Sequence, residues 1–427
     1  MSEDLLKRRY RLVGKGAPLF YEKPLHVVRG EGVLLFDAEG NEYLDAYNNV
    51  PVVGHCNPRV VEALTHQAGL LNVHTRYLHE NLLDYTERLT ATFSAPLDMA
   101  ILTCTGSEAN DVALRMVREL TGKRGIICSN STYHGNTTAV DELSTMFRGG
   151  KSESPDVRSV PFPETYRPLH GLTGEVLADA YVNEVETAIQ AFEESGTGFA
   201  GMLVCPIFAN EGLPDVPSGV MQRVARLVRE AGGLLIFDEV QAGFGRTGHM
   251  WGHQMIGVEP DIVTMGKPMG NGHPIAGLVS SADVINAFRS RVMYFNTFGG
   301  SPVSCAVGLA VLDVIEQDRL LDNVRNVGAY VAQGLRELKQ RHEAIGDIRA
   351  RGLFFGVEMV SDRARKTPSA EMANVVLNRM RENGVLISRA GPFDNVLKMR
   401  PPLPFTKAHA DRLLGTLDQC LEAIAHV

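Results

Sequence analysis

Cysteine is scarce in this chain of 427 residues: there are six, and no two of them form a C-x-x-C pair. Four of the six lie in apolar stretches, which favours buried thiols in a reducing compartment over disulfides or zinc ligands. Residues 7–11 include several basic side chains, but no apolar run follows them, so a secretory signal is not predicted. Nowhere do 18 apolar residues follow one another, which disfavours a membrane span. We expect a cytoplasmic protein.

Positive charge is not concentrated anywhere either. The formal net charge is -8, and no cluster of Lys and Arg is dense enough for a nucleic-acid-binding surface. The composition, 44% hydrophobic and 22% charged, is that of a globular protein, and the length suffices for two domains. We therefore expect neither nucleic acid nor membrane as a partner.

The middle of the chain alternates short apolar runs with amphipathic stretches. The runs lack polar alternation, as strands do that are covered on both faces. Candidate strands are 100–104, 125–128, 201–205, 234–237, 262–265 and 276–280. Helical spacing of apolar residues between them, as in 109–120 and 220–231, predicts a mostly parallel α/β sheet. The proline-rich stretch 155–168 is expected to be a surface loop.

The pattern changes after about residue 310. A long helical pattern runs to about residue 343, and shorter strand and helix patterns follow it: 352–359, 370–381, 386–388, 396–399 and a helix from Lys407. This mixture predicts a smaller α+β domain at residues 311–427. Residues 33–36 and 42–44 predict a hairpin, so we expect residues 1–50 to join the small domain and residues 51–310 to form the large one.

One glycine pattern suggests another class of protein. Gly243, Gly245 and Gly248 fit G-x-G-x-x-G in form, as in dinucleotide-binding folds. However, five residues separate the preceding strand from the first glycine, and no helix opens after the last. Such folds also place the motif in their first βα unit, so a nicotinamide or flavin enzyme is not predicted.

A pair of histidines has metal-ligand spacing. His249 and His253 are four residues apart, but Trp251 and Gly252 lie between them and no H-E-x-x-H glutamate is present. We interpret both histidines as structural and predict no metal site.

Two short segments could hold an anion or a planar ring. Gly106 and Ser107 come where the strand 100–104 passes into a helix, and free amides at a helix N-terminus suit a phosphate. Ser107 acting as an N-cap would explain the same residues. Tyr133 and His134 closely follow the strand 125–128, where an aromatic ring could stack on a cofactor or simply pack in a loop. Alone, both motifs favour the ordinary structural explanation.

An acid and a lysine follow two further candidate strands. Asp238 follows 234–237, and Lys267 follows 262–265. Enzymes that use pyridoxal phosphate are built in this way: the lysine amine forms the Schiff base, and the aspartate keeps the ring nitrogen protonated. The pattern predicts Lys267 and Asp238 as the catalytic residues of such an enzyme.

Two cations lie close together near the end of the chain. Lys398 and Arg400 are two residues apart on a candidate strand, so their side chains project from the same face. They could bind a substrate anion together, but an exposed strand face with solvated charges explains them equally well.

These motifs together resemble the class III (ω-amino) aminotransferase family of pyridoxal phosphate enzymes over nearly the whole chain. The matching stretches are 106–110, 133–135, 238–248, 266–268 and 296–300, and five motifs in the right order are highly specific. The resemblance implies the type I aminotransferase fold, an α/β architecture with a mostly parallel seven-stranded sheet in the large domain plus the smaller α+β domain.

The resemblance also implies which residues surround the ring of pyridoxal 5'-phosphate. Lys267 would carry the Schiff base, and Asp238 would hold the pyridine nitrogen. Gln241 would approach the ring hydroxyl. Tyr133 would stack on the ring, with His134 beside it.

The cofactor phosphate would be held by two subunits. Gly106 and Ser107 would bind it from one subunit, and Thr297 would reach it from the other. The family therefore implies a homodimer with shared active sites.

Within the family, the chain most resembles the ethanolamine-phosphate phospho-lyases, in stretches 47–56, 76–81, 265–274 and 395–402. One segment departs from the aminotransferase pattern. Residues 205–212 read Cys-Pro-Ile-Phe-Ala-Asn-Glu-Gly, where many members read Glu-Pro-x-Gln-Gly-Glu-Gly. The glutamate that pairs with a carboxylate-binding arginine in some members falls on Asn210, and Glu211 need not replace it. This disfavours glutamate or 2-oxoglutarate as amino partner but not pyruvate.

Two reactions fit these residues. In both, the substrate amine displaces Lys267, which then takes a proton from the carbon next to nitrogen. A phospho-lyase next expels phosphate, giving an aldehyde, ammonia and phosphate, whereas a transaminase passes the amino group to a 2-oxo acid. The lyase needs a cationic pocket, for which Arg76, Lys398 and Arg400 are candidates. From the subfamily likeness we expect a phospho-lyase acting on a substrate such as phosphoethanolamine. The alternative is a transaminase acting on an ω-amino acid or amine with pyruvate or another 2-oxo acid.

Overall fold

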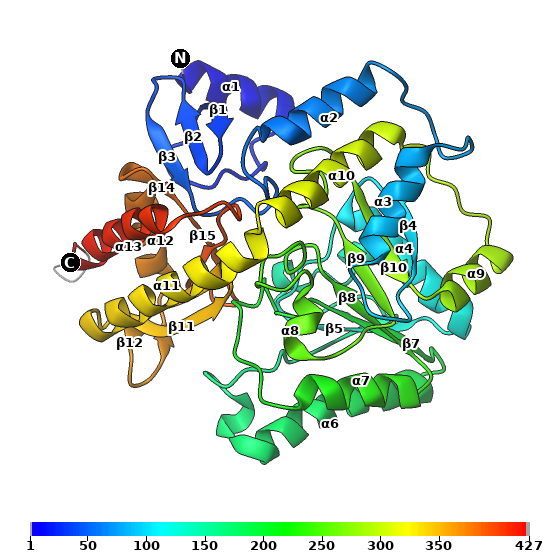
Figure 1. The fold of residues 1–427 in the computed structure, drawn as a ribbon. Coiled ribbons are helices and arrows are strands. Elements are labelled where there is room, and N and C mark those ends of the chain that lie inside the picture. The colour runs from blue at the N-terminus through cyan, green and yellow to red at the C-terminus, as the bar shows by residue number, and fades with distance from the viewer. Residues whose placement is uncertain (1, 424–427) are drawn as a thin grey trace.

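The computed structural model describes residues 2–423, and a large central sheet organises most of them (Figure 1). Within these residues the sheet has seven strands in the order β4-β10-β9-β8-β7-β5-β6. The strands are β4 (Met99–Thr103), β5 (Gly125–Ser129), β6 (Val157–Val160), β7 (Phe199–Val204), β8 (Leu234–Asp238), β9 (Ile262–Met265) and β10 (Ala276–Ser280). Only β10 is antiparallel to its neighbours; the pairs from β9 to β6 are parallel. The mostly parallel sheet predicted from the sequence pattern, and the seven strands implied by the family resemblance, are confirmed.

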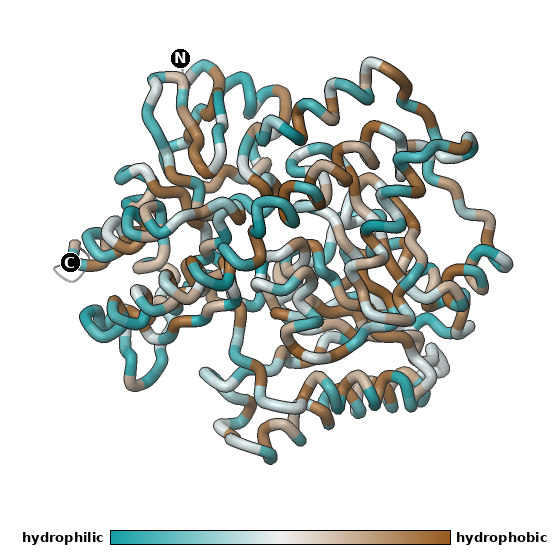
Figure 2. Tube along the Cα trace, in the orientation of Figure 1, coloured by the Kyte–Doolittle hydropathy of each residue, from teal (hydrophilic) through white to brown (hydrophobic). Residues whose placement is uncertain are grey.

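Helices cover both faces of this sheet, which explains strands that are apolar on both sides. On one face α4 (Gly106–Thr121) and α9 (Ala282–Arg291) pack against side chains such as Ile126 and Ile236. On the other face α6 (Gly174–Glu194) and α7 (Val220–Glu230) lie side by side and pack against Ile127 and Phe237. The rest of that face is covered by α3 (Glu80–Thr90) and α10 (Pro302–Gln317), and α2 (Pro58–Ala68) packs on α10. Along α7, hydrophobic and hydrophilic residues alternate as expected of such a covering helix (Figure 2).

Two smaller sheets bring both ends of the chain together. One has the order β1-β2-β3-β14 and the other β11-β12-β16-β15, with β13 paired to β12. Their strands are β1 (Val27–Glu31), β2 (Leu34–Asp37), β3 (Glu42–Asp45), β11 (Ile345–Arg351), β12 (Phe354–Asp362), β13 (Thr367–Pro368), β14 (Val385–Leu386), β15 (Ser388–Ala390) and β16 (Val396–Met399). β14 runs parallel to β3, so the predicted N-terminal hairpin is extended by a strand from the far end of the chain.

The remaining helices are α1 (Ser2–Val13), α5 (Thr138–Asp141), α8 (Gly252–Ile256), α11 (Leu320–Arg341), α12 (Ala370–Glu382), α13 (Lys407–Glu422) and the short turns Thr145–Phe147 and Leu169–Gly171. Of these, α1, α11, α12 and α13 lie around the smaller sheets, and the others lie beside the central sheet and its helices. The helix α11 packs on β11, and α12 and α13 pack on each other. No helix in residues 2–423 is long and apolar enough to cross a membrane.

Two predictions about single elements are wrong. The stretch 155–168 is not only a loop, because it contains β6, a short edge strand between Pro155 and Pro161 that pairs with β5 alone. The helical pattern up to residue 343 is two helices, because Arg319 adopts a left-handed φ of 50° between α10 and α11. The strand β11 was also not expected.

Candidate active site

Asp238 and Lys267 meet at one edge of the central sheet. Asp238 ends β8, and Lys267 comes two residues after β9. These strands are parallel neighbours, with Asp238 opposite Thr264, so both side chains emerge where carboxyl ends of strands converge. A narrow cavity of about 20 Å³ lies here, lined by Tyr133, His134, Cys205, Asn210, Asp238, Val240, Gln241 and Lys267. Five of the predicted site residues are therefore brought together.

The carboxylate of Asp238 is buried and fixed by its neighbours. Its Oδ2 lies 2.7 Å from His134 Nδ1 and accepts a hydrogen bond from Asn110 Nδ2 at 3.1 Å, while Oδ1 accepts one from the Val240 N–H at 3.0 Å. Burial alone would raise the pKa of Asp238. The hydrogen bond and charge of His134, the Val240 N–H and the charge of Lys267 outweigh burial and lower that pKa. Asp238 therefore stays anionic.

Asn110 is a site residue to which the sequence analysis gave no role. It is fully buried in α4, and its Nδ2 also donates to the His134 carbonyl at 2.8 Å. Thr264 Oγ1 donates to Asn110 Oδ1 at 2.5 Å, which links the site to β9. A polar residue within the apolar stripe of α4 was the signal that could have identified it.

Lys267 has an amine that loses its proton easily. The Lys267 side chain as a whole is exposed to the cavity, but its terminal amine is surrounded by protein atoms. Burial and the positive charge of Arg400 lower the pKa of Lys267 to about 8, although Asp238 pulls it in the opposite direction. A lysine with such a pKa is suited to act as a nucleophile and as a base.

Two buried cations converge on a single amide. Lys398 and Arg400, each 6% exposed, lie in β16 and just after it. Lys398 Nζ donates to Gln241 Oε1 at 3.0 Å, and the Arg400 guanidinium donates to the same oxygen. In residues 2–423 no ion pair joins either cation to a carboxylate. The nearby Asn210 accepts a hydrogen bond from Gln241 Nε2 at 2.8 Å, but its amide is neutral. Burial, followed by the charge of Arg400, lowers the pKa of Lys398 well below its usual value. Uncompensated buried charges of this kind are costly unless a ligand supplies the opposite charge.

Arg400 is held in place from the N-terminal part of the chain. Its Nε donates to the Tyr47 carbonyl at 3.1 Å, and its guanidinium lies 4.8 Å from the centre of the Tyr47 ring. The next residue, Pro401, accepts a hydrogen bond from the fully buried Arg246, whose Nε donates to Asn49 at 3.0 Å. Arg246 belongs to the glycine pattern at 243–248, so that segment is a buried structural connection.

The start of α4 offers free amides beside the same cavity. The N-cap is Thr105 and not Ser107: the Thr105 side chain accepts from the Glu108 N–H, and Glu108 accepts from the Thr105 N–H at 3.0 Å. This leaves the amides of Gly106 and Ser107 without partners inside the helix. Gly135 has φ +146°, and a Cβ there would lie 2.5 Å from Ser107 Oγ, so only glycine lets the segment after Tyr133 approach so closely.

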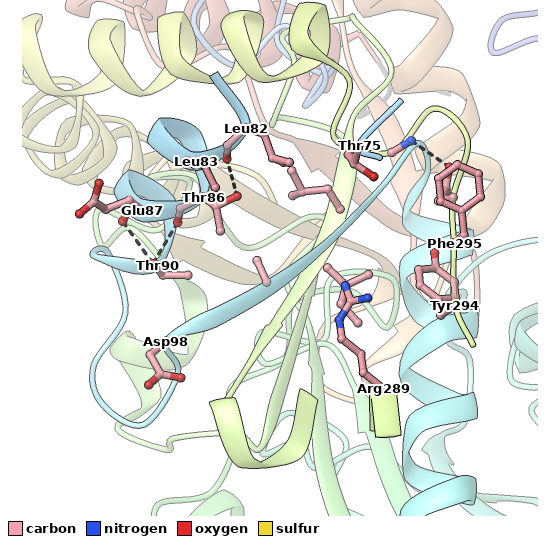
Figure 3. Close-up of a pocket in the computed structure, with 15 residues that line it drawn as sticks. Thr75, Leu82, Leu83, Thr86, Glu87, Thr90, Asp98, Arg289, Tyr294 and Phe295 are labelled. Carbon is pink, nitrogen blue, oxygen red and sulfur yellow. Dashed lines mark hydrogen bonds between the residues drawn. The ribbon is translucent and has the colours of Figure 1, made fainter. Parts of the chain in front are cut away.

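Arg76 and Thr297 are not among the residues that line the small cavity. Both are exposed, and the Arg76 guanidinium lies 4.0 Å from the centre of the Phe295 ring. Next to them is a cavity of about 600 Å³, with Leu82, Leu83 and Thr86 of α3 on one side and Tyr294 and Phe295 on the other (Figure 3). No contact in the described part of the chain joins Arg76 to Lys398 or Arg400.

Known proteins similar to this chain are enzymes. The family profile described as "Aminotransferase class-III" matches residues 20–421. A Drosophila melanogaster protein named alanine–glyoxylate aminotransferase 2-like is 40% identical over 99% of this chain and 87% of its own. A Caenorhabditis elegans protein named ethanolamine-phosphate phospho-lyase homolog 1 is 36% identical over 98% of this chain and 93% of its own. The solved structure of a phospholyase from Arthrobacter in complex with phosphoethanolamine superposes with a TM-score of 0.94, at 46% identity over 98% of this chain and all of the other.

The cavity residues fit the cofactor of this family, pyridoxal 5'-phosphate. Asp238 is anionic and can therefore pair with a protonated pyridine nitrogen. Lys267 supplies an amine whose pKa is lowered. The free amides of Gly106 and Ser107 suit the phosphate, because they lie at a helix N-terminus. Gly266 lets the segment before Lys267 approach Gly106 closely, since a Cβ on Gly266 would lie 3.2 Å from the Gly106 nitrogen. The predicted resemblance, fold and cofactor are confirmed. The chain belongs to the class III aminotransferase family.

Proposed function

We propose that the protein is a pyridoxal phosphate-dependent phospho-lyase that removes phosphate from an O-phosphorylated amino alcohol such as phosphoethanolamine. One observation supports this most directly: Lys398 and Arg400 are buried side by side without a carboxylate partner in residues 2–423. A phosphate dianion carries two negative charges and could neutralise both. A substrate carboxylate carries only one.

Asn210 supports the same proposal. Many family members have a glutamate at this position, and a carboxylate there would neutralise one of the two cations. Here the Asn210 amide accepts from Gln241, donates to the Tyr133 carbonyl at 3.0 Å and adds no charge. Glu211 does not replace that glutamate, because its hydrogen bonds go to Ser129 and to backbone behind the cavity.

Each residue around the cavity has a proposed role. The bound cofactor supplies an acceptor for the electrons of the broken bond. Lys267 would hold the cofactor, and its amine would take the proton from the carbon next to the substrate nitrogen. Asp238 keeps the ring nitrogen protonated. Lys398 and Arg400 bind the phosphate and stabilise its charge as it leaves.

Two further contacts would orient the cofactor. We propose that Tyr133 stacks on its ring with His134 beside it, and that Gln241 faces its hydroxyl group. Gly106 and Ser107 would bind its phosphate through the start of α4. No metal is needed for any of these roles.

A homodimer would complete the site. Leu78, Met293 and Phe298 are 98%, 82% and 71% exposed, and they belong to the same segments as Arg76 and Thr297. Covering such apolar side chains favours association with a second copy of the chain. In that dimer Thr297 would reach the cofactor phosphate of the other subunit, and Arg76 would lie close enough to its anion site to assist substrate binding.

The domain limits and the compartment also remain proposals. We place the large domain at residues 51–310 and the small one at 311–427, with residues 1–50 joined to the latter through the β3–β14 pair. No disulfide joins the cysteines in residues 2–423, as is usual for proteins of the reducing cytoplasm, and we propose that compartment.

A transaminase is the second candidate, because Arg400 alone could bind a carboxylate and relatives such as the Drosophila protein carry an aminotransferase name. Incubating the purified holoenzyme with O-phosphoethanolamine distinguishes the two reactions. The lyase predicts equal amounts of free phosphate and acetaldehyde, and Lys267→Ala should produce neither. Formation of alanine from pyruvate without release of phosphate would favour the transaminase and contradict the lyase.

A further inference from the structure

The turn that follows β3 is shaped by a buried carboxylate, Asp45. Asp45 ends β3 and is fully buried. Its Oδ1 accepts hydrogen bonds from the N–H groups of Tyr47 at 3.0 Å and Asn48 at 2.9 Å, and its Oδ2 accepts one from Asn48 Nδ2 at 3.0 Å. His55 Nε2 lies 2.6 Å from the same Oδ2. Aspartates close turns in this way, so Asp45 fixes the shape of residues 45–48.

The turn 45–48 is also where the N-terminal part of the chain holds Arg400. The Arg400 N–H donates to the Ala46 carbonyl at 2.8 Å, and its Nε donates to the Tyr47 carbonyl at 3.1 Å. The guanidinium lies 4.8 Å from the centre of the Tyr47 ring. Both the main chain and the side chain of Arg400 are therefore attached to the turn that Asp45 shapes. None of the roles proposed above uses Asp45.

The attachment at Nε decides where the rest of the Arg400 guanidinium points. The guanidinium also donates to Gln241 Oε1, the oxygen that accepts from Lys398. Its donors lie in one plane in a fixed fork, so an acceptor that holds Nε also orients the other N–H groups. A change in the shape of the turn would therefore move these N–H groups away from the place where Lys398 and Arg400 meet.

We propose that Asp45 is a positioning residue, which holds the turn 45–48 so that Tyr47 directs the Arg400 guanidinium at the substrate anion. Asp45 acts through the turn and not by contact with that anion. The inference rests on the proposed binding of a substrate anion by Arg400. It is the same whether the anion is a phosphate or a carboxylate.

The negative charge of Asp45 has an effect of the opposite sign. Burial lowers the pKa of Arg400, and the charge of Asp45 is among the influences that raise it. The same charge repels an anion bound at Arg400. Loss of the charge alone would therefore strengthen anion binding, whereas loss of the turn geometry would weaken it. The direction of the change distinguishes the two effects.

The same small sheet contains a matched carboxylate, Asp37, at the end of β2. Asp37 is also buried, and its Oδ1 accepts from the N–H groups of Glu39 at 3.1 Å and Asn41 at 2.8 Å. Its Oδ2 accepts from Asn41 Nδ2 at 2.9 Å and from the Tyr43 hydroxyl at 3.0 Å. Asp37→Ala therefore removes a similar set of hydrogen bonds from a turn that, in the described chain, has no hydrogen bond to Arg400.

Three amines measure the effect in the holoenzyme. Phosphoethanolamine carries a phosphate, β-alanine carries a carboxylate, and propylamine carries no anion. The absorbance of the bound cofactor, recorded by stopped flow before turnover, gives a dissociation constant for each. Asp45→Ala should raise the constant of the anionic amine that wild type binds by about tenfold and leave that of propylamine unchanged. Asp37→Ala should change none of the three.

A conservative variant tests the role of the hydrogen bonds. Asp45→Asn removes the charge but keeps one oxygen that can accept from the N–H groups of Tyr47 and Asn48. It should weaken binding of the anionic amine less, by about threefold. If Asp45→Ala does not fold, as judged by thermal melting, Asp45→Asn decides alone. Binding of the anionic amine as tight as in wild type, or tighter, would overturn the proposal.

Two other results would also overturn it. One is an equal weakening of propylamine, which would show a general disturbance of the site. The other is an equal weakening of the anionic amine by Asp37→Ala, which would show that any loosening of the small sheet has this effect.

Wild type alone tests the proposed function. A phospho-lyase must bind phosphoethanolamine and release phosphate from it. A wild type that binds β-alanine instead would contradict the phospho-lyase, and the Asp45 variants would then be compared with that carboxylate. If neither anionic amine binds more tightly than propylamine, Arg400 holds no substrate anion and both proposals fail.

Discussion

The charge on Lys267 depends on residues from three separate parts of the chain. Its own burial disfavours the ammonium form, and Arg400 near the C-terminus adds a repulsive charge, while Asp238 attracts it. With a pKa of about 8, the amine is mostly neutral above that pH and can attack a carbonyl group. The reactivity of the lysine is therefore partly set by the residue proposed to bind the substrate anion.

Arg400→Met should raise the pKa of Lys267, because it removes that repulsive charge. The pH at which apoenzyme takes up cofactor at half its maximal rate should then move upward by about one unit. Stopped-flow absorbance of cofactor uptake against pH measures this midpoint. Arg412→Met is a control, since Arg412 pairs with Glu42 on the surface. An unchanged midpoint in Arg400→Met would show that Arg400 does not act on Lys267.

Only part of the site was predictable residue by residue. Asp238 and Lys267 could be found because each lies at or just beyond the end of an apolar strand, and parallel strands place their ends together. Asn110 acts through hydrogen bonds to segments distant in sequence, and nothing in the local pattern specifies those partners. Ser107 was a plausible N-cap, but the choice between it and Thr105 depends on backbone geometry that residue type does not determine.

At the scale of single elements, the N-terminus of α4 is stabilised by a capping box. Thr105→Ala removes the acceptor for the Glu108 N–H and should lower the free energy of unfolding by about 1 kcal/mol. Urea unfolding of the apoenzyme measures the loss. Thr173→Ala offers a matched control, because Thr173 is the N-cap of α6 but makes no side-chain capping hydrogen bond. Equal losses in the two variants would contradict a specific role for the box.

The strand β16 carries Lys398 to Gln241 at the candidate active site. Lys398→Met should weaken competitive inhibition by inorganic phosphate about 10- to 100-fold, because it removes a charged hydrogen-bond donor from a buried anion site. The inhibition constant is obtained from initial rates at several phosphate concentrations. Lys407→Met, at the start of α13, should leave it unchanged. Inhibition of equal strength in Lys398→Met and wild type would mean that phosphate binds elsewhere.

Elements were predicted well where an apolar run was long and clearly bounded, and poorly where it was not. β8 and β9 are continuous apolar runs between clear breaks, and their bounds differ little from prediction. β6 is short and lies among prolines, so composition suggested a loop. The end of α10 was missed because the apolar spacing continues past it, and only the conformation of Arg319 interrupts the helix.

At the scale of the whole molecule, the exposed apolar side chains around the 600 Å³ cavity should be buried between two subunits. Leu78→Asp would place a charge in that interface and should convert the dimer to a monomer at micromolar concentration. Sedimentation equilibrium measures the mass. Cofactor binding should weaken in parallel, because Thr297 of the second subunit would be lost from the site.

Val176→Asp serves as the control for that prediction. Val176 is 60% exposed on α6, which lies away from α3 and α9 (Figure 1). The same change there should alter neither the mass nor cofactor binding. A Leu78→Asp protein that still sediments as a dimer would place the interface on another surface.

The parallel pairing of β3 with β14 has a consequence for synthesis of the chain. A ribosome releases β1, β2 and β3 early, but the strand that covers the open edge of β3 emerges only near the end of translation. During that interval the edge offers unpaired amides and carbonyls to any other nascent polypeptide. We expect yields of intact enzyme to depend on chaperones that shield this edge, and truncated products lacking residues after 385 to aggregate.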